Sequence, residues 1–65
     1  MIYYHVSSFI GNNHYPTVSQ LYKTKNGAVN AFNKRMGSKC YDRIVLWKED
    51  TSDKYNGKIL MEVTL

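Results

Sequence analysis

A single helical pattern lies near the middle of the chain, with strand patterns on both sides of it. The spacing of apolar residues predicts a helix from about Lys25 to Met36. Its apolar stripe, at i, i+3 and i+4 spacing, consists of Ala28, Val29, Phe32 and Met36. Thr24 is a favourable N-cap residue, and Gly37 is a favourable left-handed C′ residue. Because one helix can cover only one face of a sheet, the second face of any sheet in this chain lacks a covering layer.

The segment before the helix predicts a β-hairpin. Residues 2–10 alternate between two sets of side chains with period two and are rich in β-branched and aromatic types. A run of turn-forming residues ends at Pro16, after which residues 17–23 predict the return strand. The alternative for this second segment is that Val18 to Tyr22 begins a longer helix, in which Gly27 would cost up to about 1 kcal/mol relative to Ala.

Two further strand patterns follow the helix, at residues 41–49 and 58–65, and a polar loop joins them. The predicted order is ββαββ, an α+β fold in which a four-stranded antiparallel sheet carries one helix on one face. No internal repeat or linker divides the chain, so we expect a single domain over residues 1–65. The order of the strands in the sheet stays open.

The small size of the chain favours association with a second copy. A domain of 65 residues buries only about 60% of the surface that its unfolded chain exposes, and with Cys40 as its single cysteine it has no internal disulfide. We therefore expect a homodimer. No segment approaches the roughly 20 apolar residues of a membrane helix, and the lone cysteine fits a cytoplasmic location.

Strand alternation predicts an aromatic and apolar face on the side of the sheet away from the helix. The residues expected to point toward the helix are Ile2, Tyr4, Val6, Ile44, Leu46, Ile59, Met61 and Val63. Those expected on the opposite face are Tyr3, His5, Phe9, Val45, Trp47 and Leu60. Contiguous exposed apolar surface of this kind marks an interface. The sequence does not distinguish a dimer seam from a face that binds another protein, because both would use the same residues.

The charges of the chain are unevenly distributed along the sequence. No acidic residue occurs before Asp42, and the net charge of the chain is +4. The candidate phosphate contacts are Lys23, Lys25, Lys34, Arg35, Lys39 and Arg43. The alternative function is therefore a basic nucleic-acid-binding module, in which Tyr3, Phe9 and Trp47 would stack on bases. The Lys/Arg-Gly-aromatic run typical of one such class of domain is absent from the sequence.

Catalytic and metal-binding patterns are weak in this sequence. The only candidates for acid–base or nucleophilic chemistry are His5, Ser7, Ser8 and His14. The two histidines could approach each other on the hairpin, but no third Cys, His or clustered carboxylate completes a metal site with them. There is no glycine-rich phosphate loop. We expect a non-enzymatic protein with no cofactor and no metal.

The segment from Tyr22 to Phe32, YKTKNGAVNAF, resembles short phage and mobile-element proteins of low-GC bacteria, in which a strand ending in Lys-Thr runs into a Gly-Ala helix. The similarity covers roughly residues 20–47. Some members of this loose class inhibit host defence, as anti-CRISPR proteins do. The resemblance implies a minimal protein-binding inhibitor that acts in the host cytoplasm by occupying a surface of a host defence or nucleic-acid-processing protein. It assigns no role to an individual residue.

Overall fold

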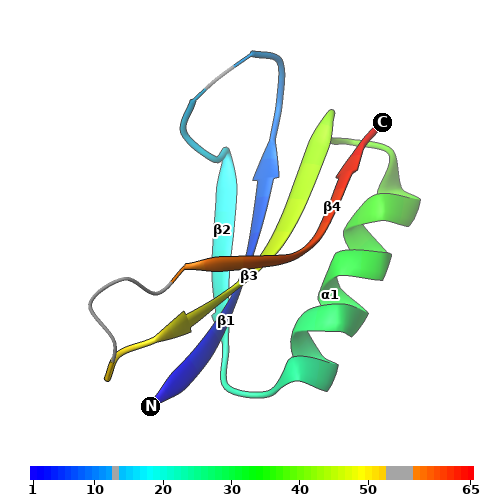
Figure 1. Ribbon diagram of the computed structural model, residues 1–65. Helices are drawn as coiled ribbons and strands as arrows, with labels where there is room; N and C mark the ends of the chain where they lie inside the picture. The colour runs from blue at the N-terminus through cyan, green and yellow to red at the C-terminus, as the bar shows by residue number, and fades with distance from the viewer. Residues whose placement is uncertain (13, 53–56) are drawn as a thin grey trace.

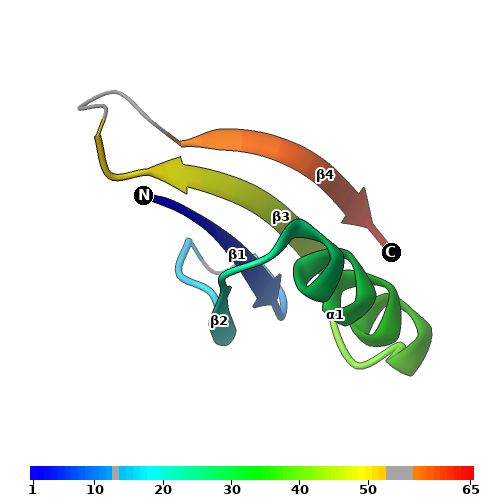
Figure 2. The same cartoon turned by 90° about the horizontal axis from the view of Figure 1, so that it is seen from below.

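The computed structural model describes residues 1–12, 14–52 and 57–65. Its elements are β1 (Ile2–Phe9), β2 (Val18–Tyr22), α1 (Lys25–Ser38), β3 (Arg43–Asp50) and β4 (Lys58–Thr64) (Figure 1). The strands form one antiparallel sheet in the order β2-β1-β3-β4. The ββαββ prediction is confirmed, and the segment after Pro16 is a strand rather than the start of a helix. Viewed at right angles, α1 lies on one side of the curved sheet (Figure 2).

The core lies between α1 and the two central strands. It is built from Val6 of β1, Ile44 and Leu46 of β3, and Ala28 and Phe32 of α1, all of them buried. The apolar stripe predicted for the helix therefore packs on the sheet as expected. Tyr41, predicted as the first residue of the third strand, precedes β3 and packs against this core.

The two ends of α1 differ in how well the sequence predicted them. At the N-terminus, the Thr24 hydroxyl accepts a hydrogen bond from the Gly27 amide at 3.2 Å, as predicted for an N-cap. The prediction for Gly37 was wrong. The helix continues to Ser38, and Lys39 adopts the left-handed conformation with φ of 57°. The Ser38 hydroxyl donates to the Arg35 carbonyl at 2.7 Å, which occupies a carbonyl of the last turn.

This helix end predicts two stabilising substitutions. Lys39→Gly removes the steric cost of a left-handed Lys, and Gly37→Ala replaces a helical glycine where an added Cβ meets no atom within 4 Å. We expect each change to raise the free energy of unfolding by about 0.5–1 kcal/mol, measured by urea denaturation. If Gly37 instead ended the helix, Gly37→Ala would destabilise the chain.

A bulge in β4 changes which side chains face the helix. Trp47 pairs with Ile59 and Leu46 pairs with Met61, so Leu60 is an extra residue between them. Since one extra residue reverses the alternation, the predictions for Ile59 and Leu60 were both wrong. Leu60 packs against the core, whereas Ile59 lies beside Trp47 on the opposite face and is 57% exposed.

No helix in the described part of the chain has the length and apolar composition needed to cross a membrane.

Candidate functional site

The face of the sheet opposite α1 is the candidate functional site, and we call it the open face. Strand register places 13 residues on it: Tyr3, His5, Ser7, Phe9, Ser19, Leu21, Arg43, Val45, Trp47, Glu49, Ile59, Glu62 and Thr64. A row of paired residues crosses all four strands at its middle, in the order Leu21, His5, Trp47 and Ile59. Leu21 is 50% exposed, so the two edge strands contribute solvent-accessible aliphatic side chains at both ends of the row.

At the centre of this row, His5 and Trp47 stack on each other. Their ring centroids lie 4.0 Å apart, and the ring planes differ by 9°. His5 Nε2 lies 3.0 Å from Glu49 Oε1, while the indole N–H of Trp47 donates to the Ser7 hydroxyl at 3.2 Å. The polar ends of both rings are thus hydrogen-bonded, which holds them in a fixed orientation. A rigid aromatic pair of this kind loses little conformational entropy when a partner covers it.

Phe9 and Arg43 form a second contact on the open face, toward the end of the sheet where β3 begins. The two residues are paired across β1 and β3, and the guanidinium carbon of Arg43 lies 4.2 Å from the centre of the Phe9 ring. Phe9 is only 7% exposed. Phe9 lies on the face of the sheet that strand alternation predicted for it, but Arg43 covers its ring.

Between these two contacts the open face is hollowed into a groove of about 330 Å³. The residues that line it are Ser7, Phe9, Arg43, Val45, Trp47, Gly57, Ile59 and Glu62. The side chains of this groove come from three different strands. It is therefore a product of the strand order, which the sequence left open.

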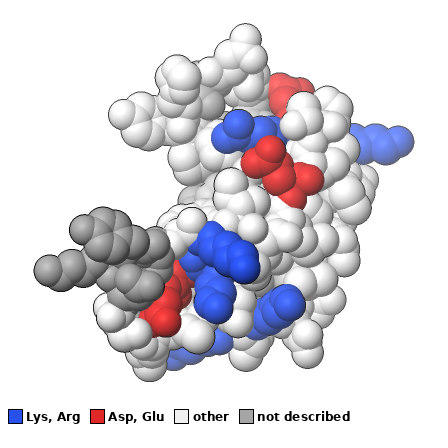
Figure 3. All heavy atoms as spheres, in the orientation of Figure 1, with Lys and Arg blue, Asp and Glu red and all other residues white. Residues whose placement is uncertain are grey.

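The residues predicted as a basic patch do not form a single surface. Lys34 and Arg35 belong to α1, on the opposite side of the sheet from Arg43 on the open face. In Figure 3 the Lys and Arg atoms are interspersed with Asp and Glu atoms instead of forming a continuous area. Exposed positions outside the open face include Lys23, Lys25 and Lys39, near the two ends of α1.

Arg35 has a structural role that the sequence did not predict. Its guanidinium donates to the Val6 carbonyl at 3.3 Å, to the Ser8 hydroxyl at 2.9 Å and to the side-chain oxygen of Gln20. Ser8 is fully buried. The guanidinium thus joins α1 to β1 and β2, and these bonds use three of the five N–H donors that the prediction had assigned to phosphate.

The residues considered for catalysis are dispersed or already hydrogen-bonded. Ser7 accepts from Trp47 and shares a hydrogen bond of 3.2 Å with Ser19, and Ser8 accepts from Arg35. His14 lies in the loop after β1, away from the His5–Glu49 pair. Within residues 1–12, 14–52 and 57–65, no three His, Cys, Asp or Glu side chains are grouped so that they could hold a metal ion.

The far end of the sheet, where β3 ends, is held by Asp50. Hydrogen bonds from the Ser52 hydroxyl and amide lower the pKa of the Asp50 carboxyl, and the N-terminal ammonium lies 3.8 Å from it. This arrangement fixes the end of β3 next to β1 and supplies no reactive group to the open face.

Comparisons with protein-family models, with curated proteins and with solved structures found no match to this chain. The resemblance to short phage proteins therefore stays a prediction. The functional proposal rests on the geometry of the open face.

Proposed function

We propose that this chain is a small non-enzymatic protein-binding module that covers a surface of a partner protein with its open face. The observation that carries the proposal is that a four-stranded sheet has its only described helix on one side. The row of Leu21, His5, Trp47 and Ile59 runs across the other side. Aromatic anchors flanked by aliphatic side chains are the composition found at the centre of protein interfaces.

The geometry favours a protein partner over a single-stranded nucleic acid. A base-stacking site needs free aromatic faces next to basic side chains. Here one face of Trp47 is covered by His5, and the Phe9 ring is covered by Arg43. Arg43 is the one basic residue among the open-face residues defined above. Nucleic-acid binding is therefore the alternative function, and the experiment below includes it as an outcome.

The class of target follows from the resemblance stated above. We propose a phage-type inhibitor of a host defence or nucleic-acid-processing protein, acting in the host cytoplasm. A net charge of +4 is the wrong sign for a mimic of nucleic acid, which would be strongly acidic. Inhibition would therefore work by covering a protein surface. A homodimer formed through the same open face would make the second copy a competing occupant, which the same variants detect.

Charge substitutions at the two exposed ends of the central row test the proposal. The wild-type chain is immobilised, a bound bacterial protein is identified after nuclease treatment, and its affinity for purified variants is then measured. We expect Leu21→Glu and Ile59→Glu each to weaken binding at least about tenfold, because each buries an unpaired carboxylate in the interface. Asn30→Glu, at an exposed position of α1, is the matched control and should bind like the wild type.

Light scattering after size-exclusion chromatography distinguishes the other outcomes. If Ile59→Glu converts a wild-type dimer into a monomer while no partner is captured, the open face is a dimer seam. If binding is lost in Asn30→Glu and kept in Ile59→Glu, the open face is not the binding surface. Retention of an oligonucleotide that falls steeply with salt would favour the nucleic-acid alternative.

A further inference from the structure

β4 is an edge strand, because the strand order of the described sheet places it beside β3 on one side only. The Leu65 amide donates to the Asp42 carbonyl at 2.8 Å, so the backbone of Leu65 points toward the start of β3. Backbone groups of an antiparallel strand point alternately to its two sides, so those of Thr64 and Glu62 point away from β3. Outward N–H and C=O groups of this kind are a template for pairing with another strand.

The bulge in β4 limits where such a strand can pair. Leu60 is the extra residue of the bulge, and the residues after it follow a continuous register with β3. A bulge and an edge lysine both discourage pairing, and Lys58 lies before the bulge at the start of the strand. The part of the edge that is available to another strand is therefore residues 61–65.

Segment 61–65 is self-complementary on the helix side of the sheet. Register places Met61 and Val63 on this side, and alternation adds Leu65. When two copies pair antiparallel about a twofold axis at Val63, each Val63 lies opposite the other and each Met61 lies opposite Leu65 of the second copy. Met61 and Leu65 are both exposed, so the pairing removes apolar surface of both copies from water.

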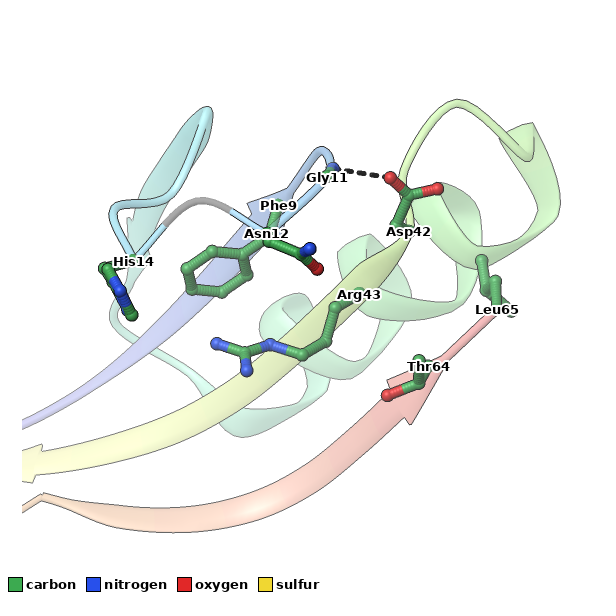
Figure 4. Close-up of a pocket in the computed structure, with 8 residues that line it drawn as sticks. All are labelled: Phe9, Gly11, Asn12, His14, Asp42, Arg43, Thr64 and Leu65. Carbon is green, nitrogen blue, oxygen red and sulfur yellow. Dashed lines mark hydrogen bonds between the residues drawn. The ribbon is translucent and has the colours of Figure 1, made fainter.

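The same register is self-complementary on the open face. Glu62 then lies opposite Thr64 of the second copy, and each such pair exchanges both of its backbone hydrogen bonds. Thr64 is paired with Arg43 of its own copy, so each Glu62 shares a row with Arg43 of the other copy, and two glutamates meet two arginines at the seam. The Asp42 carboxylate does not take part, because it accepts a hydrogen bond from the Gly11 amide and points toward Gly11 in Figure 4.

Other registers fit this edge less well. A shift of the second copy by one residue would oppose side chains that belong to different faces. A twofold axis at Glu62 would place two carboxylates directly opposite each other, which is destabilising. We infer that two copies of this chain associate through residues 61–65 and join their four-stranded sheets into one continuous sheet. Ile59 and the rest of the central row lie outside the pairing, so the inference does not rest on the proposed function.

Disulfide trapping in a glutathione buffer tests the register, with Cys40→Ser in every variant to remove the native thiol. Val63→Cys should give a covalent dimer, because opposite residues at a non-hydrogen-bonded position have Cα atoms about 4.5 Å apart, within the range for a disulfide. Met61→Cys and Leu65→Cys should give about tenfold more covalent dimer when mixed than either gives alone, because only the mixture brings two thiols together. Ser19→Cys, on the other edge strand, is the control and should give little.

Analytical ultracentrifugation tests the association without a cross-link. Thr64→Pro removes an outward N–H, and with it one backbone hydrogen bond in each of the two pairs, so the dimer dissociation constant should rise at least about tenfold. Thr64→Ala keeps this N–H and should associate nearly as well as the wild type. Ile59→Glu, outside the paired segment, should remain a dimer.

A wild-type chain that stays monomeric would overturn the inference, as would cross-linking that is as strong in Ser19→Cys as in Val63→Cys. Cross-linking of Met61→Cys with Val63→Cys in place of Leu65→Cys would overturn the register. A dimer that is dissociated by Ile59→Glu and not by Thr64→Pro would place the seam on the open face and would also overturn the inference. These measurements use the chain alone, so their outcome is separate from the partner binding that tests the proposed function.

Discussion

Phe32→Ala should lower the free energy of unfolding by about 3–5 kcal/mol, which is the usual cost of removing a buried aromatic side chain. Phe32 is 3% exposed and lies in the core between α1 and the central strands. A chain of 65 residues has a total stability of about 3–10 kcal/mol at ordinary values per residue. We therefore expect the variant to lose about a third or more of the total stability, measured by urea denaturation followed by far-ultraviolet circular dichroism.

The control for this substitution is Leu21→Ala, which truncates a side chain on the open face. Leu21 is 50% exposed, so its truncation should change the unfolding free energy by no more than about 1 kcal/mol. The contrast tests whether α1 packs on one face of the sheet and leaves the other without a layer. Equal losses in the two variants would mean that the open face is as tightly packed as the core.

Arg35→Met should cost about 2–4 kcal/mol, even though the aliphatic part of the side chain is retained. The substitution removes the donors that bond to the Val6 carbonyl, the buried Ser8 hydroxyl and Gln20. A buried group left without its partner costs about 1–3 kcal/mol, and Ser8 has no access to water that could replace Arg35. Urea denaturation measures this loss directly.

Two neighbouring substitutions separate this structural role from a role in binding phosphate. Lys34→Met removes an exposed charge on the same helix and should change stability by less than about 0.5 kcal/mol. Arg35→Lys keeps the charge but cannot reproduce the planar fork, so it should lose about half or more of the stability lost by Arg35→Met. If all three variants are as stable as the wild type, the contacts of Arg35 do not hold α1 to the sheet.

Local chemistry was sufficient to predict most of the secondary structure. The alternation in residues 2–10, the return strand after Pro16 and the N-cap at Thr24 each depend on residues that are close in sequence, and each is present in the structure. The end of α1 was harder to predict. Gly37 and Lys39 compete for the left-handed position, and hydrogen bonding by Ser38 extends the helix past the glycine.

The composition of the open face depended on contacts that a single sequence does not specify. The bulge exchanges Ile59 and Leu60 between the faces, and its signal in the sequence is the run of three apolar residues 59–61, which breaks strict alternation. The stacking of His5 on Trp47 requires β1 to lie next to β3. The same strand order places Arg43 over Phe9 and so separates Arg43 from the basic residues of α1.

Fluorine NMR of the chain labelled with 5-fluorotryptophan tests whether the open face is the surface that a partner covers. Trp47 is the single tryptophan, so the label yields one resonance from the middle of the central row even when the partner contains tryptophans of its own. With the partner at saturation, we predict that this resonance shifts and that its H₂O/D₂O isotope shift falls as water is excluded. A resonance and an isotope shift that both stay unchanged in the complex would show that the partner binds elsewhere.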